Sequence, residues 1–447
     1  MYSKSYNLVI NKKISSFKNN IKVDSDKSIS IRSFIISSIS QNVSIIKNVL
    51  ESEDVFSTIQ CLRKLGVRII KKSKGNYLVY GKGLGSLYAK KNTELNFGNS
   101  GTLARLLIGV LSSTPNIEIK VKGDHSLNKR DMKKLIFLMS KFGATFLPKN
   151  KFKFPLKFIS SEMPVGINYR SGVSAQLKSA VIFAGLNSYG NTKIYESKKS
   201  RNHTENMLRN NKNTIKTKDG TTNFILISGK KELKQIKIKV PGDPSSAAFF
   251  TALTLLNSNS SLRINSICLN KTRIGFYNLL KKQGAKIKFK NLHKENNELK
   301  GDVLVQSSKL KPITASKKYY VSSTDEYPIL FIIAALTRGT SKFYGIGDLV
   351  NKESNRIKEM QNILKQVGVK SVSTKNNIKI YGKGLFETYK KIYVKNLGDH
   401  RICMSTFVLA SIIGAKAKIK NFETVNTSSP SFLKIMKQLG ANFEIQK

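Results

Sequence analysis

A helix–glycine–strand phrase recurs along this chain of 447 residues and constrains its fold more than any other feature. In each copy a helix-like stretch runs into a glycine and a small or β-branched residue, and then into an alternating stretch such as Ala285–Phe289. Glycine adopts at low cost the positive φ that closes a helix, and alternation with a period of two is typical of a strand. The five clear copies carry their glycine at Gly66, Gly143, Gly284, Gly368 and Gly440.

The spacing of the copies predicts the domain organisation. Most neighbouring copies lie about 70 to 85 residues apart, and one gap is about twice as long. That gap contains Asn206–Ile215, a helix-like start without the glycine, which we count as a degenerate sixth copy. The period is too long for a solenoid repeat, and the chain is too long for one ordinary core. The sequence therefore predicts an α/β fold of α+β repeats, with two similar domains of three units each.

The formal net charge of +51 is compatible with several kinds of partner. It suits a nucleic-acid-binding protein, a site for polyanionic small molecules, or a compositional drift toward lysine that has no function. The lysines are spread along the whole chain, and no helix-turn-helix, zinc-finger or RNP-type signature is visible. We attribute most of the charge to composition, and a basic nucleic-acid-binding protein stays an alternative.

The cysteines and the apolar runs predict a cytoplasmic protein. Cys61, Cys268 and Cys403 are few and far apart, and apolar residues flank each of them, which argues against disulfides and zinc and favours buried thiols. The longest apolar run, Tyr327–Leu336, has about ten residues, half of what a membrane span needs. The N-terminus lacks an apolar stretch that would suit a signal peptide.

Polar and charged residues gather where apolar helices are expected to begin. Free backbone N–H groups and the helix dipole attract anions there, and nearby Lys or Arg adds donors. Asp325 and Glu326 stand before the apolar run Ile329–Leu336, which makes them candidates for acid–base groups. Cations at helix starts in both halves predict two positive faces across a cleft. The segments are Asp26–Arg32, Phe97–Arg105, Gly123–Arg130, Ser171–Lys178, Ser200–Met207, Val240–Phe249, Ser323–Pro328, Asn351–Arg356 and Gly398–Arg401.

Eight of these motifs, in this order, resemble those of the EPSP synthase family of enolpyruvyl transferases. They read DKSISIR, GNSGTLAR, SAQLKSA, SRNHTENML, VPGDPSSAA, DEYP, KESNR and DHR, and the resemblance covers nearly the whole chain. It implies two domains of three βαβαββ units each, with helices inside and sheets outside, an inverse pseudo-barrel with a cleft between the domains. It also implies domain boundaries: residues 1–26 with 242–447 form the first domain and 27–241 the second, with crossings near Lys27 and Pro241–Asp243.

The resemblance further implies the activity. The enolpyruvyl (1-carboxyvinyl) group of phosphoenolpyruvate passes to the 5-hydroxyl of shikimate 3-phosphate, and phosphate is released through a tetrahedral intermediate, in the shikimate pathway of aromatic amino acid biosynthesis. It implies no cofactor and no metal, no nucleic-acid or membrane partner, a monomer, and a target of glyphosate.

The resemblance also assigns roles to residues of this chain. Catalysis would fall to Asp325, Glu353, Lys27 and His400, with Asp325 taking the hydroxyl proton. Phosphoenolpyruvate would contact Lys27, Gly101, Arg130, Gln176, Arg356 and Arg401. Shikimate 3-phosphate would contact Lys27, Ser28, Arg32, Ser174, Ala175, Gln176, Arg201, Asp325 and Lys352. Asn355 departs from the family pattern, because it replaces a common aspartate in the KESNR segment.

An enolpyruvyl transferase that acts on a UDP-amino sugar is the nearest alternative, since it shares the fold and the donor. That enzyme carries a reactive cysteine on a mobile loop. The matching region here, Gly123–Arg130, contains no cysteine, and the chain has the Ser-Ala-Gln element at Ser174–Gln176 that suits shikimate 3-phosphate.

Overall fold

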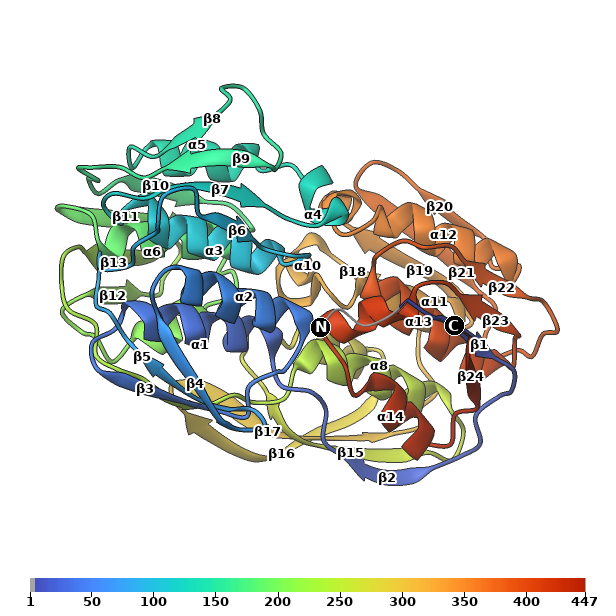
Figure 1. Cartoon of the computed structure of the whole chain (residues 1–447). Coiled ribbons are helices and arrows are strands. Elements are labelled where there is room, and N and C mark those ends of the chain that lie inside the picture. Colours follow the sequence, from blue (N-terminus) through green and yellow to red (C-terminus); the bar gives the residue numbers. More distant parts are fainter. Residues whose placement is uncertain (1–4, 447) are drawn as a thin grey trace. The chain divides into compact units, whose positions relative to one another are not determined.

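The computed structural model describes residues 5–446, which form two compact units (Figure 1). Unit 1 comprises residues 5–24, 241–293 and 299–446. Unit 2 comprises Ser25–Val240 together with Lys294–Glu298. Residues 1–4 and 447, which the predicted first domain includes, lie outside the described residues.

Within residues 5–446 the strands that pair into sheets form six four-stranded sheets. Unit 2 contains β14(Lys237–Lys239)-β3(Val43–Lys47)-β5(Asn76–Tyr80)-β4(Arg68–Ser73), β6(Glu94–Asn96)-β7(Glu118–Lys122)-β9(Leu156–Ile159)-β8(Thr145–Leu147) and β10(Asn168–Ser171)-β11(Asn191–Glu196)-β13(Asn223–Ser228)-β12(Ile215–Lys218). Unit 1 contains β22(Ile392–Val394)-β23(Ala417–Ile419)-β1(Asn7–Ile10)-β24(Phe443–Gln446), β18(Thr314–Ala315)-β19(Gly339–Tyr344)-β21(Asn377–Gly382)-β20(Ser371–Ser373) and, except for its hairpin tip Lys294–Glu298, β16(Lys286–Glu295)-β17(Glu298–Gln306)-β15(Ser261–Cys268)-β2(Lys18–Ile21).

Every sheet repeats one pairing scheme. Two parallel strands lie side by side, as β6 and β7 do, and two further strands that pair antiparallel, such as β8 and β9, complete the sheet. In four of the sheets one crossover segment that contains a helix joins the parallel pair, as α3 (Gly101–Ser112) joins β6 to β7. In the other two sheets β3 pairs with β14 and β2 pairs with β15, and most of unit 2 lies between the paired strands along the chain. The six predicted α+β units are thus confirmed, including the degenerate copy, whose short helix α7 (His203–Leu208) leads into β12.

The five repeat glycines have the backbone conformation expected of them. Their φ angles are +85° at Gly66, +94° at Gly143, +94° at Gly284, +75° at Gly368 and +93° at Gly440. In the sixth unit α7 ends at Arg209, which keeps a right-handed conformation. Glycine at these positions lets a helix stop and turn into a strand within a few residues.

Three almost wholly buried helices form the centre of each unit. They are α1 (Lys27–Ile39), α3 (Gly101–Ser112) and α6 (Ala175–Leu186) in unit 2, and α8 (Pro244–Leu256), α11 (Tyr327–Ala335) and α13 (His400–Ile413) in unit 1. In each unit the three central helices pack together, except that α1 reaches α6 through α3. A helix that is apolar on all sides has to be enclosed by other elements. Strands such as β11 alternate buried and exposed residues, so the sheets turn one face to water.

The remaining helices are short or amphipathic and lie around the central ones. They are α2 (Glu53–Lys64), α4 (His125–Lys129), α5 (Lys133–Ser140) and α7 in unit 2, and α9 (Gly275–Lys282), α10 (Tyr320–Ser323), α12 (Arg356–Gln366) and α14 (Phe432–Gln438) in unit 1. Helices inside and sheets outside are therefore the arrangement that the sequence predicted. Among the described residues no helix is both long and apolar enough to span a membrane.

The three cysteines are buried, and none forms a disulfide bond within residues 5–446, as the sequence predicted. Burial raises the pKa of the Cys61 thiol to about 12. Burial, reinforced by the negative charge of Asp399, also raises the pKa of Cys403. Because the thiolate is the reactive form, these side chains behave as small apolar groups.

The close packing of α3 against α6 depends on Gly109. A methyl group there would lie 2.6 Å from the carbonyl oxygen of Ala180. We expect Gly109→Ala to lower the free energy of unfolding by about 1–3 kcal/mol, although alanine is intrinsically the better helix former by about 1 kcal/mol. Urea unfolding would measure the change, with Gly220→Ala as control because its nearest contact would be at 3.6 Å. Equal stability of the two variants would contradict this packing.

Candidate active site

The first turns of α1, α3 and α6 contain most of the predicted binding residues of unit 2. Each helix begins with a side-chain cap that the sequence pattern indicated. Asp26 accepts a hydrogen bond from Ile29 N (2.8 Å), Ser100 from Leu103 N (3.2 Å) and Ser174 from Leu177 N (3.3 Å). Burial becomes continuous at Ile29 in α1 and at Lys178 in α6, so the accessible polar groups of both helices lie at their first residues.

The starts of α3 and α6 are joined by hydrogen bonds through Gln176. Its Oε1 accepts from Arg105 Nη1 (2.9 Å), and its Nε2 donates to Thr102 Oγ1 (2.9 Å). Gln176 was predicted from the sequence, whereas Arg105 and Thr102 were not assigned roles. Their position in the GNSGTLAR motif, one turn into α3, was the available signal.

Two guanidinium groups converge beside Gly101. A Cβ at this position would lie 2.6 Å from Arg105 Nη1 and 3.0 Å from Arg130 Nη1. Arg130 is also held by Asn99, whose Oδ1 accepts from Nη2 at 2.8 Å. The absence of a side chain at residue 101 therefore lets two guanidinium groups come close to the backbone there, and two neighbouring cations suit an anionic ligand.

Lys27 and Arg32 of α1 are both held by neighbouring side chains. Lys27 Nζ lies 3.1 Å from Asp54 Oδ2, a partner on α2 that the sequence did not reveal. Arg32 is buried, and it donates from Nε to Thr204 Oγ1 (2.9 Å) and from Nη1 to the carbonyl oxygen of Ser28 (3.0 Å). These contacts fix the direction of both cationic side chains.

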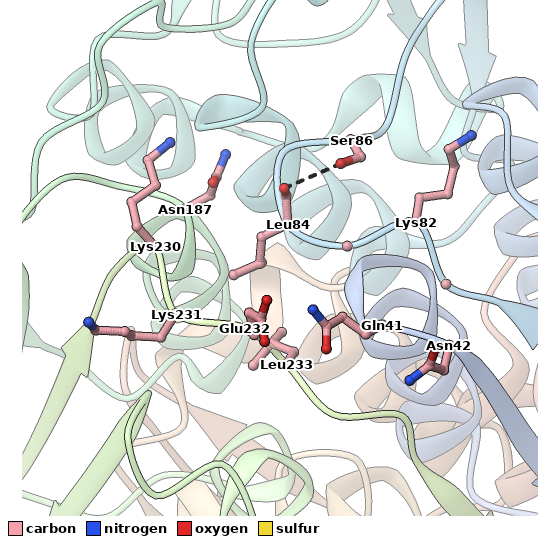
Figure 2. Close-up of a pocket in the computed structure, with 12 residues that line it drawn as sticks. Gln41, Asn42, Lys82, Leu84, Ser86, Asn187, Lys230, Lys231, Glu232 and Leu233 are labelled. Atoms are coloured by element: carbon pink, nitrogen blue, oxygen red, sulfur yellow. Dashed lines mark hydrogen bonds between the residues drawn. The ribbon is translucent and has the colours of Figure 1, made fainter.

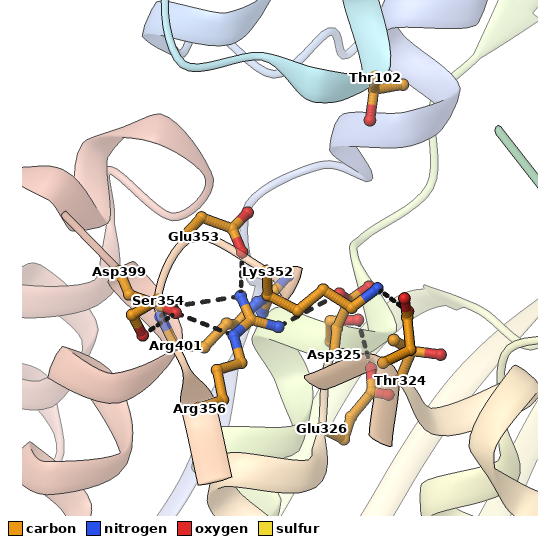
Figure 3. Close-up of polar contacts among 12 residues, drawn as sticks. Thr102, Thr324, Asp325, Glu326, Lys352, Glu353, Ser354, Arg356, Asp399 and Arg401 are labelled. Atoms are coloured by element: carbon orange, nitrogen blue, oxygen red, sulfur yellow. Dashed lines mark hydrogen bonds and ion pairs between the residues drawn. The ribbon is translucent and has the colours of Figure 1, made fainter. Parts of the chain in front are cut away.

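In unit 1 a fully buried guanidinium, that of Arg356, gathers three carboxylates (Figure 3). Arg356 Nε lies 2.9 Å from Asp399 Oδ2, Nη2 lies 2.6 Å from Glu353 Oε2, and Nη1 lies 3.9 Å from Asp325 Oδ1. Burial opposes the charged guanidinium, but the negative charges of Asp399 and Glu353 outweigh it and raise the pKa of Arg356. The structure thus brings together Asp325 and Glu353, the two predicted catalytic carboxylates.

Asp325 and Glu353 remain partly open to solvent. The side chain of Asp325 is 27% exposed and that of Glu353 17%, whereas Asp399 is fully buried. Two of the three carboxylates can therefore reach a ligand. Asp399 accepts hydrogen bonds from Arg356, from Ser354 Oγ (2.9 Å) and, as the cap of α13, from Arg401 N (3.0 Å). We conclude that Asp399, which had no predicted role, fixes the positions of Arg356, of Ser354 and of the start of α13.

Arg401, at the start of α13, has unused donors in a buried position. Its side chain lies over the ring of Phe249 at 5.8 Å, and the residue is 4% exposed. Neither Nε nor Nη1 has a hydrogen-bond partner among residues 5–446. A buried guanidinium with unmatched donors is costly to the fold and well suited to bind a carboxylate or phosphate. His400 precedes it in the same first turn and is also buried.

Lys352 and Asn355 lie on either side of Glu353. Lys352 Nζ is 2.6 Å from Asp348 Oδ2, and this pair is more exposed than the Arg356 cluster. Asn355 caps α12 by accepting from Lys358 N at 3.1 Å. The departure from the family's aspartate therefore preserves the cap that begins this helix.

A separate cavity of about 630 Å³ in unit 2 contains none of the predicted site residues (Figure 2). It lies near the carboxyl ends of α1 and α6, where Gln41 and Asn187 line it. Lys82 and Lys230 also line it, but their ammonium groups lie over the rings of Tyr88 (5.0 Å) and Tyr189 (4.6 Å) and do not converge on a common point. The cavity therefore lacks the focused donors of the helix starts.

Comparisons with known proteins identify the family and the fold. The family model described as EPSP synthase (3-phosphoshikimate 1-carboxyvinyltransferase) matches residues 11–436. The chain is 37% identical over 443 residues to the 3-phosphoshikimate 1-carboxyvinyltransferase of Zymomonas mobilis subsp. mobilis. This alignment covers 98% of this chain and 97% of the relative. It is also similar to the solved EPSP synthase of Acinetobacter baumannii, with a TM-score of 0.85 and 32% identity over 99% of this chain and 100% of that one. The enolpyruvyl transferase NikO of Streptomyces tendae shares the fold, with a TM-score of 0.77 and 12% identity over 99% of each chain.

Arg356 and Arg401 should differ in what their loss does to stability. We expect Arg356→Met to lower the free energy of unfolding by about 3–5 kcal/mol, because Asp399 would be left buried without a cation. Arg401→Met should leave the free energy of unfolding unchanged or higher, because an apolar chain of similar length replaces a buried guanidinium whose Nε and Nη1 have no hydrogen-bond partner among residues 5–446. Urea titration of both variants would measure this, and equal losses would contradict the assigned partners.

Proposed function

The chain belongs to the EPSP synthase family, and from this premise we propose how its residues perform the family's reaction. The family match and the full-length relatives identify an enzyme that transfers the 1-carboxyvinyl group of phosphoenolpyruvate to shikimate 3-phosphate, in the shikimate pathway of aromatic amino acid biosynthesis. They favour this activity over transfer to a UDP-amino sugar and over nucleic-acid binding.

Phosphoenolpyruvate is bound, in this proposal, by cations at the helix starts. Unit 2 contributes Lys27, Arg130 and Gln176, with Gly101 letting the guanidinium groups come close to the backbone. Unit 1 contributes Arg356 and Arg401. The observation that carries the assignment is the buried Arg401, whose Nε and Nη1 have no hydrogen-bond partner among the described residues. A phosphate or carboxylate oxygen would satisfy them.

Shikimate 3-phosphate is assigned to the first turns of α1 and α6 and to the segment before α7. The residues of unit 2 are Lys27, Ser28, Arg32, Ser174, Ala175, Gln176 and Arg201, and those of unit 1 are Asp325 and Lys352. Support comes from the capped N-termini of α1 and α6, whose first-turn N–H groups and hydroxyls favour an anion.

In the reaction, Asp325 accepts the proton of the 5-hydroxyl as that oxygen bonds to C2 of phosphoenolpyruvate. The methylene carbon takes a proton, with Glu353, Lys27 and His400 serving this transfer. The tetrahedral intermediate then expels phosphate as the methyl carbon returns a proton and the double bond re-forms. Positioned acid–base groups typically contribute about 10²–10⁴-fold, and fixed cations stabilise the charge that shifts between oxygens.

Further properties follow from the same proposal. The site beside Gly101 also suits glyphosate, because a side chain there would displace the guanidinium groups of Arg105 and Arg130. The three buried cysteines, which form no disulfide bond among the described residues, support a cytoplasmic location. We also propose a monomer with small-molecule substrates and neither nucleic-acid nor membrane partners, and a reaction that needs no metal or cofactor.

Phosphate release tests the activity. The purified chain is incubated with phosphoenolpyruvate alone, with shikimate 3-phosphate added, and with a UDP-amino sugar as control acceptor. We expect release that depends on shikimate 3-phosphate. Release only with the sugar would move the chain to the other branch of the enolpyruvyl transferases, and release with neither acceptor would refute the activity.

Asp325→Asn tests the assignment of the base. The amide cannot take a proton, so we expect turnover to fall by about 10²–10⁴-fold while shikimate 3-phosphate still binds in calorimetry. Glu444→Gln, the same acid-to-amide change on the exposed strand β24, should leave turnover unchanged. Full activity of Asp325→Asn would remove this residue from the mechanism.

A further inference from the structure

Unit 2 contains a buried ionic cluster that the reaction does not use. Lys178 of α6 is fully buried, and its Nζ lies 3.1 Å from Glu196 Oε2 and 2.6 Å from Glu205 Oε1. The two carboxylates are 1% and 4% exposed, so one ammonium and two carboxylates are all withdrawn from water. Removing such charges from water costs several kcal/mol per ion, and apolar groups of similar size often stabilise a protein as well or better. The cluster therefore calls for a role other than stability.

The second oxygen of Glu196 holds the segment that leads to Arg201. Glu196 Oε1 accepts from Ser200 N at 3.1 Å and from Ser200 Oγ at 2.6 Å. Ser200 is itself fully buried. The carboxylate of Glu196 thus links α6, through Lys178, to the residue directly before Arg201.

Glu205 extends the cluster to α7, a helix too short to be stable by itself. Its neighbour Thr204 accepts from Arg32 Nε (2.9 Å) and shares a hydrogen bond with Ser179 Oγ (2.8 Å). Arg32 Nη2 also donates to Ser179 Oγ at 3.3 Å. Hydrogen bonds between side chains therefore connect α1, α6 and α7 next to the ionic cluster.

We propose that Lys178, Glu196 and Glu205 form a positioning triad for shikimate 3-phosphate. This inference rests on the proposed function, which assigns that substrate to Arg32, the start of α6 and Arg201. The triad does not touch the substrate, because Lys178 is fully buried. It holds α6, the Ser200–Arg201 segment and α7 in one arrangement, so that the donors from all three meet the ligand together.

The two glutamates differ in how they tolerate an amide. Every group that faces the Glu196 carboxylate in the contacts above is a donor, namely Lys178 Nζ and the N–H and hydroxyl of Ser200. The NH₂ group of a glutamine at residue 196 would have to face one of these donors, so Glu196→Gln loses either the contact with Lys178 or a hydrogen bond from Ser200. Glu205 Oε2 has no hydrogen-bond partner among residues 5–446, so Glu205→Gln can turn its NH₂ that way and keep its oxygen on Lys178.

This difference gives a matched pair of variants. We expect Glu196→Gln to raise KM for shikimate 3-phosphate roughly tenfold, since a small misplacement of binding groups is costly, while kcat and KM for phosphoenolpyruvate change far less. Glu205→Gln should stay near the parent, as should Glu118→Gln, an exposed carboxylate of β7. Urea unfolding of each variant, and activity per folded molecule, would separate positioning from loss of fold.

Two outcomes would overturn the triad: an unchanged KM for shikimate 3-phosphate in folded Glu196→Gln, or equal effects of the two triad amides. Arg201→Ala separates this failure from that of the proposed function. If Arg201→Ala raises KM for shikimate 3-phosphate and Glu196→Gln does not, the triad inference alone fails. If neither variant changes KM, the assignment of this substrate to Arg201 fails as well.

Discussion

The rest of the structure depends on the burial of six central helices, three in each unit. Their sides are enclosed by other helices and sheets, so polar chemistry is confined to their ends. Continuous burial begins at the third residue of α1 and after the first turn of α6. The N–H groups of the first turn lack helical partners and take caps such as Asp26 and Ser174. The anion site that we propose at these helix starts thus follows from a fold that buries the rest of each helix.

The two units use these starts differently. In unit 2 hydrogen-bonding side chains and guanidinium groups cluster around Gly101 and Gln176, and they mainly supply donors. In unit 1 the buried guanidinium of Arg356 is surrounded by Asp325, Glu353 and Asp399. The guanidinium of Arg356 pairs with Asp399 because a buried carboxylate requires a cation as partner. Asp325 and Glu353 lie close enough to interact with the same guanidinium. The two carboxylates that we propose as proton-transfer groups, Asp325 and Glu353, therefore both lie in unit 1.

Much of the fold was predictable because it is encoded locally. A glycine with positive φ after each helix and alternation in the next strand are short-range signals, and the five clear copies appear in the structure as expected. The sixth copy was recognisable only by its place in the series, because α7 ends at Arg209 without a glycine. Partners such as Asp54 for Lys27, or Thr204 for Arg32, could not be found in this way. The two members of each pair lie far apart in the sequence, and the local pattern around one residue gives no information about its partner.

The sequence alone determined the six-unit repeat, the capped helix starts and, through eight ordered motifs, the resemblance to a family. These depend on backbone preference and on residue order, which neighbouring residues express. The tertiary structure alone decided which charges meet: Arg356 with its three carboxylates, Arg401 with none among the described residues, and Lys178 with Glu196 and Glu205. The physical reason is that electrostatic energies depend on separation in space and on burial, and both arise only when distant segments pack together.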